Sequence, residues 1–189
     1  MEGGPAIVDV LTGKRAPSGR LPMSIPYCVG QIPVHYDSLM TGVLTGRESR
    51  NGTFPDTRIS RPIRCFLWIR TDLYRDGAFR VRLSKTVLSP GETMEASVTL
   101  KNTGRREGTE TVQLYLRDVT GSTARPVKQL KGWKHITLKP GRRQKLFFHQ
   151  RRTVEILSGT GKLGQRAERL CLIGMDSKTE NAASFRLEK

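Results

Sequence analysis

Carboxylates are the side chains with which this 189-residue chain could carry out acid–base chemistry. Asp and Glu can act as general acid, general base or nucleophile when a site holds them close together. The candidates are Asp9, Asp37, Glu107, Glu110 and Asp118. All five fall in predicted turns or on predicted strand surfaces, where charged side chains are usually solvated. We therefore assign no catalytic residue in this chain.

The histidines and cysteines show no pattern typical of a metal or cofactor site. The three histidines are isolated, without HxH or HExxH spacing: His35, His135 and His149. The three cysteines are widely spaced and odd in number, which fits neither a disulfide framework nor a paired zinc site: Cys28, Cys65 and Cys171. No Gly-rich phosphate loop follows a predicted strand. We expect buried or incidental thiols, no metal and no cofactor.

The formal net charge of +16 would suit a nucleic-acid partner, but its distribution argues against one. Residues 43–82 contain nine Arg and four acids, and residues 139–170 contain nine Lys or Arg and two acids. Neither stretch alternates its cations with aromatic residues or spaces them along one helix face. The chain also has no run of eighteen apolar residues and no signal-peptide pattern. We expect no nucleic-acid or membrane partner, and the localisation stays unknown.

The spacing of apolar residues predicts one short helix followed by an antiparallel β-sandwich. Residues 3–11 have helical spacing, and Gly13 is placed to end that helix. From residue 79 onward, short alternating segments are separated by turns at residues 89–92, 102–108 and 139–141. The alternating apolar positions are expected to face an inner layer: Val81, Leu83, Met94, Ala96, Val98, Leu100, Val112, Leu114, Leu116, Leu146 and Phe148.

Two long strings give the chain a family resemblance. Residues 3–36, GGPAIVDVLTGKRAPSGRLPMSIPYCVGQIPVHY, resemble the end of the α/β sandwich domain of family 3 glycoside hydrolases. Residues 98–141, VTLKNTGRREGTETVQLYLRDVTGSTARPVKQLKGWKHITLKPG, resemble the fibronectin type III-like domain of the same enzymes, especially bacterial β-glucosidases of the periplasmic type. The resemblance implies a remnant of the α/β domain in residues 1–42, an irregular basic linker in 43–78 and a fibronectin type III-like domain in 79–189.

The resemblance implies that this chain has a structural role and carries no catalytic residues. Family members take the nucleophilic Asp from an N-terminal barrel and the acid/base from a loop before the matched segments, so we expect both to precede Met1. The sandwich is then expected to buttress the barrel and α/β domains of a β-glucosidase and to be inactive alone. The alternative is a free-standing carbohydrate- or protein-binding module, which needs an exposed aromatic platform. We expect Trp133 to fill the core beside Val127 and Leu130, and Arg125 to be a candidate clamp for a neighbouring carboxylate.

The basic stretches depart from the family pattern. The family segment expected before the sandwich ends in LFPFGYGLTYT.F. Back-translation of residues 54–67 in a shifted frame can give PGYADIPTDTLFP, residues 67–74 can give FGYGLTY, and residues 161–171 can give ENWGSEPSAFV. We hypothesise that residues 43–78 and 150–172 are read out of frame. The strands that these stretches should provide would then be lost, leaving exposed edges and a marginally stable protein.

The nucleotide sequence tests this hypothesis. Read in the other two frames, the DNA for residues 43–78 and 150–172 is expected to encode the missing family segments. DNA whose alternative frames encode unrelated sequence through both stretches would refute it.

Overall fold

The computed structural model describes residues 3–15, 18, 36–37, 80–89, 92–119, 126–150, 168–177 and 179–187. Predictions for other positions, including Cys28, Cys65, Arg125 and His35, fall outside the described residues. The described elements are one helix, α1 (Gly3–Leu11), and the strands β1 (Arg82–Leu83), β2 (Val87–Leu88), β3 (Met94–Lys101), β4 (Gly108–Asp118), β5 (Gln129–Leu138), β6 (Arg143–Gln150), β7 (Glu168–Gly174) and β8 (Ala182–Leu187).

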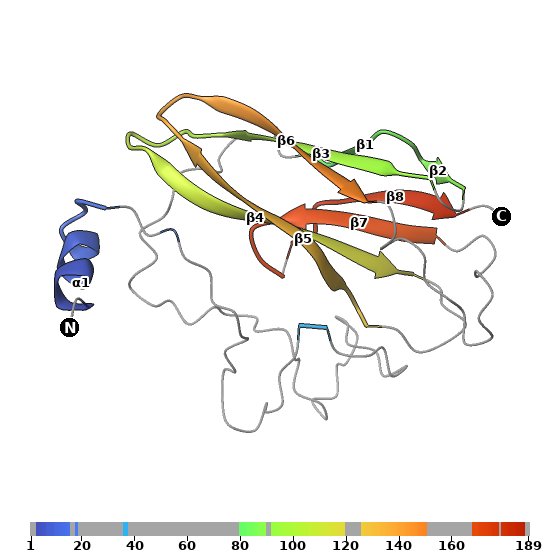
Figure 1. The fold of residues 1–189 in the computed structure, drawn as a ribbon, viewed down its shortest axis with the longest axis horizontal. Helices are drawn as coiled ribbons and strands as arrows, with labels where there is room; N and C mark the ends of the chain where they lie inside the picture. The colour runs from blue at the N-terminus through green and yellow to red at the C-terminus, as the bar shows by residue number, and fades with distance from the viewer. Residues whose placement is uncertain are drawn as a thin grey trace, which may run out of the picture.

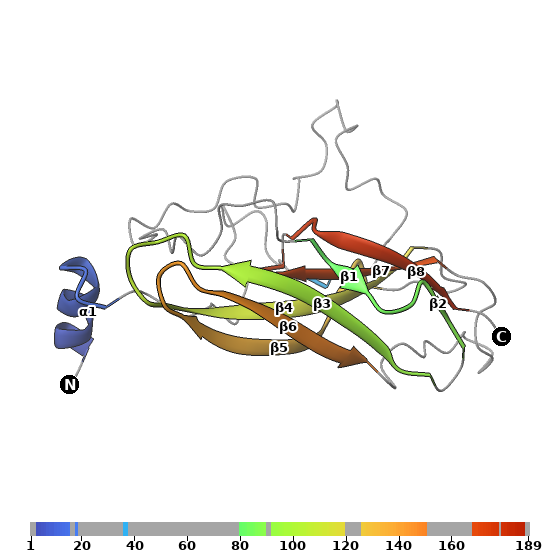
Figure 2. The same cartoon turned by 90° about the horizontal axis from the view of Figure 1, so that it is seen from above.

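The strands form two stacked sheets, which confirms the predicted β-sandwich (Figures 1 and 2). One sheet has the order β1-β3-β6, and the other has the order β2-β8-β7-β4-β5. The strand pairs are antiparallel except β2 with β8, which is parallel, so the five-stranded sheet is mixed. β4 and β7 therefore lie inside the larger sheet, whereas β5 is an edge strand.

The core is formed by alternate residues of the facing strands, as predicted. On β3, Met94, Ala96, Val98 and Leu100 are at most 2% exposed. Side chains from β4 and β6 belong to the same hydrophobic cluster: Val112, Leu114, Leu116, Leu146 and Phe148. Each large apolar side chain removed from water contributes about 1.5–3 kcal/mol, so this interdigitated layer is the main source of the fold's stability.

The expectation that residues 150–172 supply no strand is wrong for the last residues of this stretch. β7 begins at Glu168 and pairs with β4 on one side and β8 on the other. Cys171 and Ile173 are fully buried in the core. Arg169 lies directly opposite Asp118, and their side chains form a buried ion pair with an Nη1–Oδ2 distance of 3.1 Å. Pairing on both edges satisfies the backbone of β7, which is why these residues are held as a strand.

Helix α1 lies beyond one end of the sandwich, next to the β3–β4 and β5–β6 turns (Figure 1). Gly13 ends the helix with a φ of 71°, as predicted, and its N–H donates to the Val10 carbonyl. A Cβ at Gly13 would lie 2.9 Å from Nη1 of Arg106 in the β3–β4 turn. The apolar side of the helix is open, since Ile7, Val8 and Leu11 are each more than half exposed.

Asn102 joins the two turns at this end of the sandwich. Its side chain is buried, and its Nδ2 donates to the carbonyls of Arg106 (2.8 Å) and Leu138 (2.7 Å). Its Oδ1 accepts from the N–H of Gly104, as expected for an Asn that folds its own turn. Its backbone exchanges hydrogen bonds with Arg142 and Gly141 of the opposite turn. One residue therefore holds the β3–β4 turn against the β5–β6 turn.

Asn102→Ala should lower the free energy of unfolding by about 2–3 kcal/mol, because the buried Leu138 carbonyl and the partly buried Arg106 carbonyl would lose their donor together. Urea denaturation of the full chain measures this change. Lys139→Ala, an exposed neighbour in the adjoining turn, is the matched control and should stay within about 0.5 kcal/mol of the unmutated chain. An Asn102→Ala protein as stable as the control would show that the turns are held by other contacts.

Candidate functional site

The outward face of the β4–β5 pair collects the most exposed aromatic side chain among the described residues. Cross-strand register places Thr111 opposite His135, Gln113 opposite Trp133, and Tyr115 opposite Leu130. Directly opposed residues share one face of a sheet. We call these six residues the Trp133 face: Thr111, Gln113, Tyr115, Leu130, Trp133 and His135.

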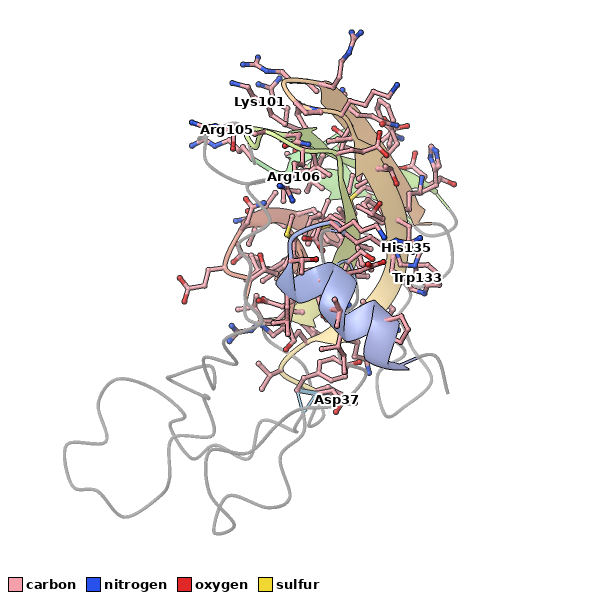
Figure 3. All side chains as sticks on the ribbon, turned by 90° about the vertical axis from the view of Figure 1, so that its left-hand side faces the viewer. Asp37, Lys101, Arg105, Arg106, Trp133 and His135 are labelled. Atoms are coloured by element: carbon pink, nitrogen blue, oxygen red, sulfur yellow. The ribbon has the colours of Figure 1, made fainter. Side chains whose placement is uncertain are left out.

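The expectation that Trp133 fills the core is wrong. Trp133 is 58% exposed, whereas Ile136 and Leu138 on the same strand are buried. Side chains alternate along a strand, so a residue three positions before Ile136 must lie on the opposite face. The indole packs edge-on against His135 with ring centroids 4.9 Å apart, and Figure 3 shows the two rings together on β5.

A β-bulge brings Leu130 onto the same face. The β4–β5 register shifts between Leu114 and Tyr115, which puts Gly132 opposite Leu114 but Leu130 opposite Tyr115. The extra residue on β5 changes the parity of the strand, so Leu130 is 36% exposed instead of packed in the core. The face therefore presents two apolar side chains that had been expected inside.

Tyr115 marks the covered end of the Trp133 face. It is 3% exposed, and the ring of Tyr36 packs edge-on against it with a centroid distance of 6.0 Å. Tyr115 Oη donates to Gln113 Oε1 at 2.7 Å, and the N–H of Leu130 donates to Tyr36 Oη at 3.5 Å. Sequence reasoning missed this contact because nothing in the spacing links positions 79 residues apart.

The electrostatic setting of Tyr115 follows from its burial. Loss of solvation, followed by the charges of Asp176 and Tyr36, raises the pKa of Tyr115 to about 12. The ammonium of Lys128 lies 5.9 Å from the ring centroid, and burial lowers the pKa of Lys128. Tyr115 is therefore a neutral hydrogen-bond donor at physiological pH, suited to packing and positioning.

The candidate carboxylates divide into exposed and buried groups. Asp37 and Glu107 are exposed, and Asp9 in α1 pairs with Lys14 at 3.2 Å, which agrees with the expectation of solvated or surface positions. That expectation is wrong for two residues. Glu110 is 1% exposed and its Oε1 accepts from the N–H of Thr111, and Asp118 is held by Arg169. Both are interior residues of the sandwich and are closed off from solvent.

The other candidate side chains have structural surroundings. Within the described part of the chain, no group of three or more His, Cys, Asp or Glu is arranged to hold a metal ion. Cys171 is a free, buried thiol, and desolvation raises its pKa to about 12, which confirms the expected buried thiol at this position. His135 Nδ1 lies 2.9 Å from Thr111 Oγ1, and His149 Nδ1 lies 3.7 Å from Glu95 Oε2. No described helix is long and apolar enough to cross a membrane.

Two family profiles match the chain, one in its N-terminal part and one in its C-terminal part. The profile of the Glycosyl hydrolase family 3 C-terminal domain matches residues 1–63, and the Fibronectin type III-like domain matches residues 110–155. Matching regions in this order identify the chain. It belongs to glycoside hydrolase family 3. The boundaries at residues 42 and 78 stay predictions.

Bacterial enzymes are among the relatives of this family 3 chain. A periplasmic beta-glucosidase of Salmonella typhimurium is 44% identical over 157 residues, which cover 78% of this chain and 19% of that protein. A putative beta-xylosidase of Formosa agariphila is 33% identical, covering 99% of this chain and 24% of the relative. The beta-glucosidase of Listeria innocua has a TM-score of 0.76 at 28% identity, covering 98% of this chain and 26% of the enzyme. The chain thus spans about a fifth to a quarter of its relatives' length.

The family match also accounts for part of the positive charge. Lys139, Arg142, Arg143 and Lys145 belong to the β5–β6 hairpin, inside the matched residues 110–155. These four cations were counted within the basic stretch 139–170, but they precede residues 150–172, for which the wrong reading frame is hypothesised. In this hairpin they are ordinary exposed side chains of a well-formed turn and strand.

Proposed function

We propose that the chain is the non-catalytic C-terminal portion of a family 3 β-glycosidase, in which the sandwich buttresses the catalytic domains. The contact between Tyr36 and Tyr115 carries this proposal. Tyr36 lies in the segment matched by the family 3 C-terminal domain, and Tyr115 lies on the sandwich. The two family segments thus meet through an aromatic contact and a hydrogen bond, which is what a buttress requires.

The chemistry of the described residues supports a structural role. Retaining glycosidases need a nucleophilic carboxylate and an acid/base on either side of the scissile bond. Glu110 and Asp118 are buried and engaged within the sandwich, and Asp9 is paired with Lys14. By resemblance, the barrel and the α/β domain of the enzyme supply the reacting groups and are the partners of this chain.

The alternative function is a free-standing carbohydrate-binding module. Trp133 supplies the exposed aromatic ring that such a module needs. We favour the buttress because the neighbouring end of the same face, at Tyr115, is already covered by a segment of the family 3 domain. A sugar platform would share its face with a protein contact.

A fusion enzyme tests the proposal. In the Salmonella typhimurium periplasmic beta-glucosidase, the region that aligns with this chain is replaced by residues 1–189 or deleted. With p-nitrophenyl β-glucoside, the isolated chain is expected to match the buffer blank. The fusion should exceed the deleted enzyme about a hundredfold, because a misplacement of ~1 Å in an active site costs a factor of that order.

Two outcomes would contradict the proposal in different ways. Hydrolysis by the purified chain above the buffer blank would show that it carries its own catalytic groups. A fusion no more active than the deleted enzyme would show that the chain does not support the catalytic domains.

A further inference from the structure

We propose that the Trp133 face is the surface through which this chain docks on the catalytic portion of a family 3 enzyme. The inference rests on the proposed function and adds to it the residues that make the contact. The occupant is the part of the enzyme that lies outside the region matched by this chain. Its surface there should be apolar, to match the exposed Trp133 and Leu130 side chains.

Trp133 and Leu130 have the properties of interface anchors. They project from the edge strand β5 on the side away from the core, and they are 58% and 36% exposed. Tryptophan is enriched among the few residues that carry most of the binding energy of protein interfaces. Strand parity and a bulge hold these two large apolar side chains outward, so they do not pack in the core and are available for a contact outside it.

The indole of Trp133 is held in place before docking. His135 packs edge-on against it, and His135 Nδ1 is within 2.9 Å of Thr111 Oγ1 on the neighbouring strand. Gln113, directly opposite Trp133, accepts a hydrogen bond from the hydroxyl of Tyr115. Side chains fixed in this way lose little conformational freedom on binding, which favours a rigid contact with a preformed partner.

The Tyr36–Tyr115 contact, which lies at one end of the Trp133 face, indicates which protein surface covers the rest of that face. Tyr36, from the matched family 3 segment, already covers Tyr115 at one end of the face, and its hydroxyl accepts from the N–H of Leu130. The chain aligns with only 19% of the Salmonella enzyme and 26% of the Listeria enzyme, so most of each relative lies outside the match. The remainder of the family 3 fold is therefore the protein surface that can extend the Tyr36 contact across Trp133.

The fusion enzyme and the isolated chain together test this surface. Trp133→Ala is introduced into both, with Phe147→Ala as the matched control. Phe147 is a half-buried aromatic that alternates with buried Leu146 and Phe148, so it lies on the outward face of the other sheet, with Lys145 Nζ 4.8 Å from its ring centroid. The measurements are the half-life of activity of the fusion at a fixed elevated temperature and the melting temperature of each isolated chain.

Trp133→Ala should shorten the half-life of the fusion about tenfold or more, as loss of an interface anchor accelerates dissociation. The same change should shift the melting temperature of the isolated chain by only a few degrees, because more than half of the indole is exposed there. Phe147→Ala should alter the fusion no more than it alters the isolated chain. A Trp133→Ala fusion with the half-life of the unmutated fusion would overturn the inference while leaving the buttress role standing.

Other occupants of the face give separate results. Binding of cello-oligosaccharides by the isolated chain that disappears with Trp133→Ala, without an effect on the fusion, would show a sugar platform instead. A dimer of the isolated chain that dissociates on Trp133→Ala, again without an effect on the fusion, would show a self-association surface. A fusion that fails to exceed the deleted enzyme would refute the proposed function and this inference with it.

Discussion

The pairing of β4 with β5 is the constraint on which the rest of the molecule depends. β4 contributes Val112, Leu114 and Leu116 to the core on one face and Tyr115 to the outward face. Because side chains alternate with a strict period of two, any residue that stabilises the core fixes the direction of its neighbours. The bulge beside Tyr115 is the one break in this alternation between β4 and β5, and it turns Leu130 outward. The register of β4 against β5 therefore determines both which side chains form the core and which form the candidate interface.

The two ends of the sandwich have different roles in this account. At one end, Asn102 ties the β3–β4 and β5–β6 turns together and Arg106 approaches the end of α1. Toward the other end, β7 is held between β4 and β8, with the Asp118–Arg169 pair buried across the β4–β7 junction. A buried ion pair of this kind contributes little net stability, yet losing either partner is costly because the other charge stays desolvated.

The sequence predicted most of the sandwich because apolar residues at every second position, bounded by turn residues, are a strong signal for a strand. It marked β3, β4 and β6 with the correct inward residues, and helical spacing with Gly13 marked α1. The orientation of Trp133 was predictable too, since its odd separation from Ile136 and Leu138 places it on their opposite face. The position of Leu130 was not, because a bulge leaves no periodic trace. β7 was misjudged since its strand character comes from pairing on both edges, and the Tyr36–Tyr115 contact depends on tertiary structure alone.

Solvent access to Trp133 shows whether this side chain docks on the catalytic domains. Hydroxyl-radical footprinting with mass spectrometry gives the oxidation rate of each aromatic residue in the isolated chain and in the fusion with the catalytic domains of the Salmonella enzyme. We expect rapid oxidation of Trp133 in the isolated chain and strong protection in the fusion, with Phe147 oxidised equally in both. Equal oxidation of Trp133 in the two proteins would contradict the proposed docking.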